Sequence, residues 1–315
     1  MSDKWQRLQY MPLIPMGEDG RRITACPTHI ALSRSAAAEG MVLLKNEQRL
    51  LPLQKGTRLA VFGKAQADYV KGGGGSGDVT VSRTVNLYEG LRALAGDVFI
   101  SEATIPFYRE HVEKELAENI APGCVPEPAL PKGLLKQAAY EADVAIISIS
   151  RFSGEGWDRK LDRSIKAPFS EFTKGEHQSA KLFARGDFYL SDGERAMVHQ
   201  VKKAFRKGVV LLNVGGVIES AWFAREKKIQ AAVLIGQGGM CGGNAAAKAL
   251  MGITNPSGNL VDTWAEDITD YPSTAGFFQS DDYVDYEDDI YVGYRYFSTM
   301  EGAAERVIYP FGFGL

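Results

Sequence analysis

Cysteines, long apolar runs and secretion signals are scarce in this sequence. Its 315 residues include only three cysteines, Cys26, Cys124 and Cys241, which lie far apart and form no C-x-x-C pair. This spacing argues against a disulfide framework and against a zinc site. No stretch approaches the roughly 18 to 20 apolar residues of a membrane span, and the N-terminus lacks the apolar core of a signal peptide. We therefore expect a cytoplasmic protein with reduced thiols and no membrane partner.

An excess of charge of one sign is also missing. The 36 Lys and Arg nearly balance the 39 Asp and Glu, for a net charge of −3 without long runs of one sign. Such a balance gives no electrostatic footprint for nucleic acid. The four histidines form no H-E-x-x-H, and no G-x-S-x-G is present. Metal chemistry and Ser-His-Asp catalysis are therefore poorly supported, and no metal is expected.

The chain does contain a regular alternation of short apolar runs and helical patterns. With 45% hydrophobic and 24% charged residues it is an ordinary globular sequence. Apolar runs at residues 59–62, 144–149, 209–214 and 231–235 have the length of strands buried on both faces. Segments of helical pattern separate them, which predicts an α/β fold: a doubly wound, mostly parallel sheet with helices on both faces.

Several element boundaries can be predicted from local signals. Thr28 is a plausible N-cap for a helix that continues through about Lys45, and Ser191 with Glu194 forms a capping box for a second helix. We also expect helices from about Val217 and over residues 244–251, and a strand over residues 260–264. Residues 286–297 alternate in their second half and should form or flank a strand.

A glycine-rich loop, residues 72–77, follows the first predicted strand. Consecutive glycines could cradle a phosphate, but there is no G-x-x-x-x-G-K-[ST], and Asp78 occupies the last position of a G-x-G-x-x-G spacing, where it would repel a pyrophosphate. A nucleotide cofactor is therefore not expected. The alternatives are a loop that approaches a neutral ligand closely and a mobile or tightly curved surface loop.

A second polar loop begins directly after the predicted strand at 144–149, with the sequence SGEGWDR at residues 153–159. Ligands bind at this edge of parallel sheets. Glycines on both sides present the Glu155 carboxylate, and the apolar face of Trp157 could raise its pKa, as a general acid requires. The alternative is an exposed acidic turn in which Asp158 and Arg159 form a local ion pair.

These segments, taken in order, resemble the α/β-sandwich domain of glycoside hydrolase family 3, the family of many β-glucosidases. The resemblance covers most of the chain from about residue 30 to its end. The matching stretches are AAEGMVLLKN at 37–46 followed by LPL at 51–53, the glycine-rich loop, SGEGWDR at 153–159, GDFYL at 186–190, NPSG at 255–258, and residues 286–296 with YPFGFGL at 309–315.

The resemblance implies a divided active site. In that family a Glu on the sandwich domain protonates the glycosidic oxygen, a role that the SGEGWDR match carries to Glu155. The Asp nucleophile lies on a separate (β/α)8 barrel domain, which has no match here. Gly74, Gly75, Ser76 and Trp157 would then bind substrate, a β-glucoside or related oligosaccharide. The reaction would be a retaining hydrolysis of terminal β-linked glucose-type residues without a cofactor.

The same resemblance suggests how the chain is organised. We expect a lead-in over residues 1–29 and one α/β-sandwich domain over residues 30–315, cut from a longer enzyme of the subgroup in which the sandwich precedes the barrel. Without the barrel the fragment should be inactive. A homo-oligomer is compatible with the sequence. The rival interpretation is a non-catalytic, ligand- or sugar-binding α/β domain in which Glu155 is only a polar contact.

Overall fold

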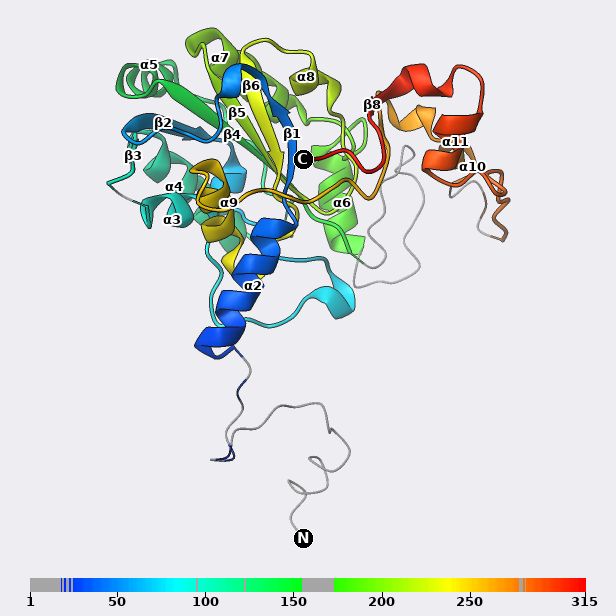
Figure 1. The fold of residues 1–315 in the computed structure, drawn as a ribbon, viewed down its shortest axis with the longest axis horizontal. Helices are drawn as coiled ribbons and strands as arrows, with labels where there is room; N and C mark the ends of the chain where they lie inside the picture. The colour runs from blue at the N-terminus through cyan, green and yellow to red at the C-terminus, as the bar shows by residue number, and fades with distance from the viewer. Residues whose placement is uncertain are drawn as a thin grey trace.

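The computed structural model describes residues 25–94, 96–121, 123–154, 173–277 and 282–315, together with positions 18, 20, 23 and 280. A six-stranded sheet with helices on both faces forms the body of the molecule, and a smaller lobe follows it at the C-terminal end of the chain (Figure 1). None of the helices within these ranges is long and apolar enough to cross a membrane.

The sheet has the strand order β1-β6-β5-β4-β2-β3. Every neighbouring pair is parallel except β1 and β6 at one edge, which are antiparallel. The predicted doubly wound, mostly parallel sheet is thus confirmed, and each of the four apolar runs predicted to be buried strands corresponds to a strand of this sheet. The strands are β1 (Val42–Asn46), β2 (Thr57–Phe62), β3 (Val98–Ile100), β4 (Val144–Arg151), β5 (Gly208–Val214) and β6 (Ile229–Leu234).

Helices cover both faces because alternate residues of the central strands point to opposite sides. Ile147 of β4 packs in one hydrophobic cluster, and its neighbour Ile146 packs in the other. The first cluster lies under α4 (Thr104–Ala117), α5 (Lys132–Glu141), α7 (Asp192–Ala204) and α8 (Ala221–Ala224). The second lies under α2 (Pro27–Glu39), α3 (Leu87–Arg92) and α9 (Gly242–Leu250). A further helix, α6, spans Thr173–Leu182.

Residues 264–315 form what we call the C-terminal lobe. Its two-stranded antiparallel ribbon joins β7 (Trp264–Ala265) to β8 (Val307–Tyr309), and its helices are α10 (Ser273–Gly276) and α11 (Tyr294–Thr299). Trp264 and Tyr309 reach back into the core of the main body. Beyond this ribbon the lobe has a small buried cluster of its own.

The first predicted helix is wrong in its extent. The structure has α2 only to Glu39, with Cys26 rather than Thr28 at the N-cap and Pro27 in the first turn. Gly40 ends the helix, and the chain then runs into β1, which pairs antiparallel with β6. The apolar positions 41 and 44 fit a helical spacing and a buried strand equally well, and pairing with a sheet edge decided between them.

Three other expectations differ from the structure. The helix predicted from Val217 is a single turn at Ala221–Ala224, and the strand predicted at 260–264 is paired only from Trp264. The alternating segment 286–297 ends in α11 and contains no strand. Its Tyr and Val residues suit a strand, but β7 and β8 pair with each other, and Tyr296 and Phe297 of α11 pack against this ribbon through their side chains instead of pairing with it.

Candidate active site

The carboxyl ends of β2 and β4 lie at the point where the order of strands reverses. β2 leads to β3 on one side of the sheet, whereas β4 leads to β5 on the other. In open parallel sheets, ligands bind in the crevice between two such strands, because the loops there leave in opposite directions. The glycine-rich loop follows β2, and residues 152–154 follow β4. Both segments singled out in the sequence therefore start at this switch point (Figure 1).

The backbone joins the glycine-rich loop to the turn after β4. The Gly74 N–H donates a hydrogen bond to Ser153 O at 2.9 Å, and Gly74 and Gly154 form a parallel bridge. A Cβ on Gly154 would lie 2.3 Å from the Gly74 nitrogen, and one on Gly74 would lie 2.9 Å from the Phe152 ring. Position 154 therefore requires glycine, since a side chain there would push the Gly74 backbone away, whereas at position 74 the neighbour is the end of the movable Phe152 ring.

The Ser153 side chain is held by loops from the two strands beyond β4. Gln237, which follows β6, donates from Nε2 to the Ser153 hydroxyl at 3.1 Å. Gly215, which follows β5, leaves room for this hydroxyl, because a Cβ there would lie 2.3 Å from Ser153 Oγ. Loops after β2, β5 and β6 thus all contribute to the position of residue 153, two residues before Glu155.

The start of the glycine-rich loop is anchored by Asn213 of β5. Its buried amide donates to Val70 O at 2.9 Å and to Gly236 O at 2.7 Å, and its Oδ1 accepts from the Val70 N–H at 2.8 Å. Lys71 bridges the two ends of the loop, with an ion pair to Asp78 and a hydrogen bond to the carbonyl of residue 79. The loop is therefore attached at its beginning, its middle and its end.

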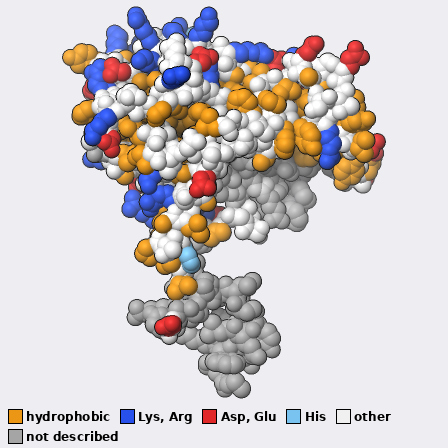
Figure 2. All heavy atoms as spheres, in the orientation of Figure 1, with side chains coloured by type: hydrophobic (Ala, Val, Ile, Leu, Met, Phe, Trp, Pro, Cys, Tyr) orange, Lys and Arg blue, Asp and Glu red, His pale blue; other side chains and the backbone are white. Residues whose placement is uncertain are grey.

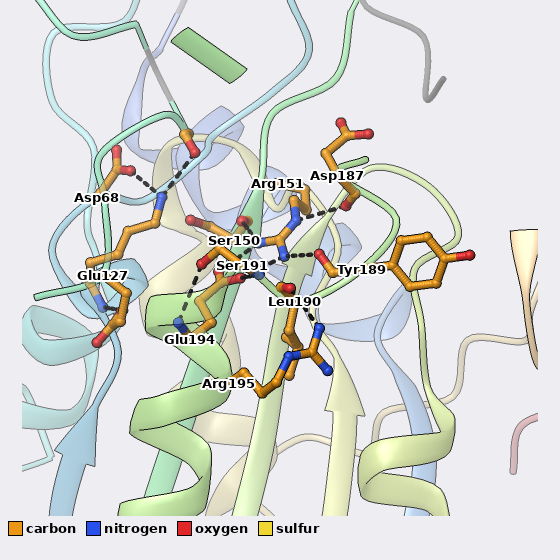
Figure 3. Close-up of polar contacts among 12 residues, drawn as sticks. Asp68, Glu127, Ser150, Arg151, Asp187, Tyr189, Leu190, Ser191, Glu194 and Arg195 are labelled. Carbon is orange, nitrogen blue, oxygen red and sulfur yellow. Dashed lines mark hydrogen bonds and ion pairs between the residues drawn. The ribbon is translucent and has the colours of Figure 1, made fainter. Parts of the chain in front are cut away.

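Arg151, the last residue of β4, is the centre of a buried polar network (Figure 3). The side chain is 1% exposed, and its two terminal nitrogens each donate to Glu194 at 2.7 Å. The remaining N–H groups donate to the carbonyls of Ser150, Asp187 and Tyr189 at 2.8 to 2.9 Å. All five guanidinium donors are thus satisfied, which is the condition for burying such a charge.

Glu194 connects this network to helix α7. Its carboxylate also accepts the Ser191 N–H at 2.8 Å in the predicted capping box, which the structure confirms. Burial alone would raise the pKa of Glu194, but the facing Arg151 guanidinium outweighs it and holds the pKa below its ordinary value. The carboxylate therefore stays ionised and fixes the end of β4 to the start of α7.

A second buried carboxylate, Glu127, lies at the end of β2. It accepts the Lys64 N–H at 2.8 Å and the Tyr108 hydroxyl at 2.8 Å. Burial raises the pKa of Glu127 to about 7, although these two hydrogen bonds favour the ionised form. The Lys64 ammonium pairs instead with Asp68 at 2.7 Å and donates to Gly123 O at 3.1 Å.

Neither buried carboxylate has the surroundings of a group that reacts with substrate. Glu127 is 8% exposed and Glu194 is 2% exposed, and both bind donors of the protein interior. Their chemistry is to hold the ends of β2 and β4 in place. Within the described ranges, no three His, Cys, Asp or Glu side chains are grouped so that they could hold a metal ion.

The predicted site residues fall into two groups. Glu155 and Trp157 lie outside the described residues. Gly74, Gly75 and Ser76 lie in the loop at the switch point, where Gly74 contacts the turn after β4. Gly75 has φ +67, a backbone conformation that favours glycine, and Ser76 is exposed.

Sequence reasoning missed the residues that support this site. Arg151 at the end of an otherwise apolar run was a usable signal, because a charge that follows a buried strand needs a buried partner. Its partner Glu194 was identified only as a helix cap. Asn213, Gln237 and Glu127 carried no local signal, since their partners are distant in the sequence.

Comparisons with known proteins agree with this architecture. The glycosyl hydrolase family 3 C-terminal domain matches residues 41–315. β-Glucosidase A of Butyrivibrio fibrisolvens is 54% identical over an alignment of 316 positions, which covers 99% of this chain and 38% of that enzyme. A β-glucosidase of Ruminococcus albus is 39% identical over 285 residues, 88% of this chain and 27% of that enzyme.

Solved structures show the same fold. β-Glucosidase 3B of Thermotoga neapolitana, in complex with glycerol, has a TM-score of 0.75 at 33% identity and covers 91% of this chain, which matches 38% of that structure. A β-glucosidase of Paenibacillus barengoltzii has a TM-score of 0.74 at 36% identity over 90% of this chain and 29% of its own. The chain thus spans less than two fifths of these relatives. It belongs to glycosyl hydrolase family 3, of which it carries the C-terminal domain.

Proposed function

We propose that this domain supplies the general acid/base of a retaining β-glucosidase and that the group is Glu155. The observation that carries the proposal is the backbone coupling at the switch point, where Gly74 binds Ser153 and bridges to Gly154 directly before Glu155. A carboxylate that follows so constrained a turn can be presented to a ligand in one orientation. Four β-glucosidases from as many bacteria are similar to this chain.

The proposed reaction has two steps. The protonated Glu155 carboxyl donates its proton to the glycosidic oxygen as the bond to the anomeric carbon breaks, and an Asp from the barrel domain forms a bond to that carbon. The Glu155 carboxylate then takes a proton from water, which attacks the same carbon and releases the sugar and the Asp. Retention of configuration requires the two carboxyl groups to be about 5 to 5.5 Å apart, so the barrel must face this loop.

The glycine-rich loop would form a wall of the cleft between the two domains. Gly74, Gly75 and Ser76 would approach the substrate closely, because glycines expose backbone donors and take up no side-chain volume. Trp157 would stack on a sugar ring and exclude water from Glu155. The substrate class is a β-glucoside or a related oligosaccharide, and no cofactor takes part.

Because the acid/base and the nucleophile would lie on different domains, this chain would be inactive without the barrel domain. Residues 30–315 would form the sandwich domain and residues 1–29 a lead-in, and the domain without its barrel would not turn over substrate. We propose a cytoplasmic enzyme on the grounds of its few cysteines.

Hydrolysis of aryl β-glucosides by the full-length gene product and its Glu155→Ala variant tests the acid/base role. We expect the variant to lose at least a hundredfold in kcat/KM on poor leaving groups and little on activated ones, because only a poor leaving group needs the proton. Added azide should raise the turnover number of the variant on activated substrates, because azide attacks the glycosyl-enzyme in place of water. The product should be a β-glycosyl azide. Glu113→Ala, an exposed glutamate of α4, is the matched control.

Two outcomes would count against the proposal. If Glu155→Ala matches Glu113→Ala on every leaving group, the acid lies elsewhere and the domain is better described as a binding module. If azide gives the α-glycosyl product, the enzyme does not act by retention.

A further inference from the structure

Large hydrophobic side chains are exposed unevenly over this molecule. Of the eighteen that are exposed in the described chain, eight lie before residue 277 and ten lie from Phe277 to the C-terminus. Six of these ten fall within twelve residues and form what we call the 283–294 surface. They are Tyr283, Val284, Tyr286, Ile290, Val292 and Tyr294, which are 44% to 89% exposed. In Figure 2 hydrophobic side chains gather on the lobe at the right of the molecule.

The lobe that carries this surface has little core of its own. Its separate cluster contains only Ala265, Phe297 and Ala303 as buried members. The two clusters of the main body contain 26 and 21 buried residues. Residues 282–293 also lack regular secondary structure and form few backbone hydrogen bonds among themselves. A contiguous group of exposed apolar side chains, here on a lobe with a small core, is typical of a site where another protein domain binds.

Acidic side chains accompany the apolar ones. Asp282, Asp285, Glu287, Asp288 and Asp289 lie in the same segment, and none of them has an ion pair with a Lys or Arg in the part of the chain that the structure describes. Asp288 also has a buried carboxylate oxygen without a hydrogen-bond donor. A buried acceptor of this kind costs free energy until a donor, from water or from a partner, reaches it.

We propose that the 283–294 surface is the place where this domain docks onto the barrel domain of the same enzyme, which rests on the function proposed above. The chain spans only 38% of the Butyrivibrio enzyme and 27% of the Ruminococcus enzyme, so most of each relative lies outside the part it matches. The partner face is then apolar at its centre and carries Lys or Arg opposite the five acidic residues.

The composition of the surface favours a protein partner over a bound saccharide. Val284, Ile290 and Val292 are branched aliphatic side chains, which neither stack on a sugar ring nor form hydrogen bonds with its hydroxyls. Tyr294 already stacks one face on Phe311, at 4.7 Å between ring centroids. Mixed aromatic and aliphatic surfaces with an acidic rim suit a domain interface instead.

Cysteine labelling of the full-length enzyme tests this assignment. Tyr286 and Tyr140 form a matched pair, since they are 89% and 86% exposed and lie on the lobe and on α5 respectively. A maleimide is added to the native Tyr286→Cys and Tyr140→Cys enzymes, and peptide mass spectrometry follows each site, with buried Cys241 as a protected reference. We expect Tyr286→Cys to react at least tenfold more slowly than Tyr140→Cys in the monomeric enzyme.

Three results would overturn the proposal. Equal labelling rates mean that the surface is open. Protection that disappears on dilution, together with a dimer in light scattering, assigns the surface to a second copy of the chain. Protection that requires added cello-oligosaccharide assigns it to a saccharide. Aryl β-glucoside hydrolysis by the parent enzyme separates these failures from that of the proposed function, because an active enzyme with an open surface refutes only the docking surface.

Discussion

The switch point of the sheet and the C-terminal lobe differ in whether their side chains find partners within the chain. At the ends of β2 and β4, charged groups are buried, and they find their partners within the chain: Arg151 with Glu194, and Lys64 with Asp68. In the lobe, six large hydrophobic residues between positions 283 and 294 remain exposed, and the acidic residues among them lack ion-pair partners in the described chain.

The contrast is between a region whose charged groups have their partners within the chain and a region whose apolar groups stay exposed. Buried charges without partners would destabilise the fold by several kcal/mol each, at roughly the scale of a domain's net stability, and at the switch point the chain supplies these partners itself. Exposed apolar residues cost far less in the isolated chain. The exposed 283–294 surface therefore does not prevent this chain from folding.

The largest expected effect concerns the buried pair. Arg151→Met should lower the free energy of unfolding of this chain by about 3 to 5 kcal/mol, because it leaves the Glu194 carboxylate buried and unpaired. Arg58→Met is the matched control, since Arg58 binds Asp143 in the same two-pronged manner at 2.9 and 2.6 Å, but with side chains 48% and 55% exposed. That variant should cost less than about 1 kcal/mol in urea unfolding.

A double variant sharpens the same test. Arg151→Met with Glu194→Leu removes both charges and should recover part of the loss, because no unpaired charge remains in the interior. If Arg151→Met costs no more than Arg58→Met, water reaches the pair and the switch point is not the closed network described above.

The next effect is a pH dependence set by Glu127. Its folded pKa is raised by burial from 4.5 to about 7, so the native state binds more protons than the unfolded state between these values. Stability therefore falls as pH rises through this window, by on the order of 3 to 4 kcal/mol at about 1.4 kcal/mol per pKa unit. Urea unfolding at several pH values measures it. Glu127→Gln should flatten the curve, and an equal slope in both proteins would refute this source of the pH dependence.

The fold was largely predictable from the sequence, because its central strands have a recognisable pattern of residues. The runs at 59–62, 144–149, 209–214 and 231–235 are short, apolar and separated by helical patterns, and each corresponds to a strand of the sheet. Local signals failed where a tertiary partner decided the outcome. Residues 42–46 joined the sheet edge instead of extending α2, and residues 294–299 formed α11, which packs against the β7–β8 ribbon without joining it.

For the site, the sequence predicted only that the two loops follow strands of the parallel sheet. The glycine-rich loop was expected to approach a ligand and the glycines beside Glu155 to present its carboxylate, whereas the bridge that the structure forms between Gly74 and Gly154 was not foreseen. The hydrogen bonds that hold this bridge come from Gln237 and Asn213, more than eighty and more than one hundred and forty residues away from their partners Ser153 and Val70. No local pattern encodes such pairs, whereas the chain fold determines them.

The smallest expected effect is in the lobe. Tyr286→Ser should change the free energy of unfolding of this chain by less than about 0.5 kcal/mol, because an exposed side chain that buries no surface contributes little to folding. Tyr286 is 89% exposed, whereas Phe297 of the same lobe is 4% exposed. Phe297→Ala should therefore cost about 3 to 5 kcal/mol in the same urea titration, by cavity formation. If Tyr286→Ser costs more than about 1.5 kcal/mol, the segment packs within the chain itself. The side chains of the 283–294 surface would then have their partners within the chain, as those of the switch point do, and the surface would not be available for docking.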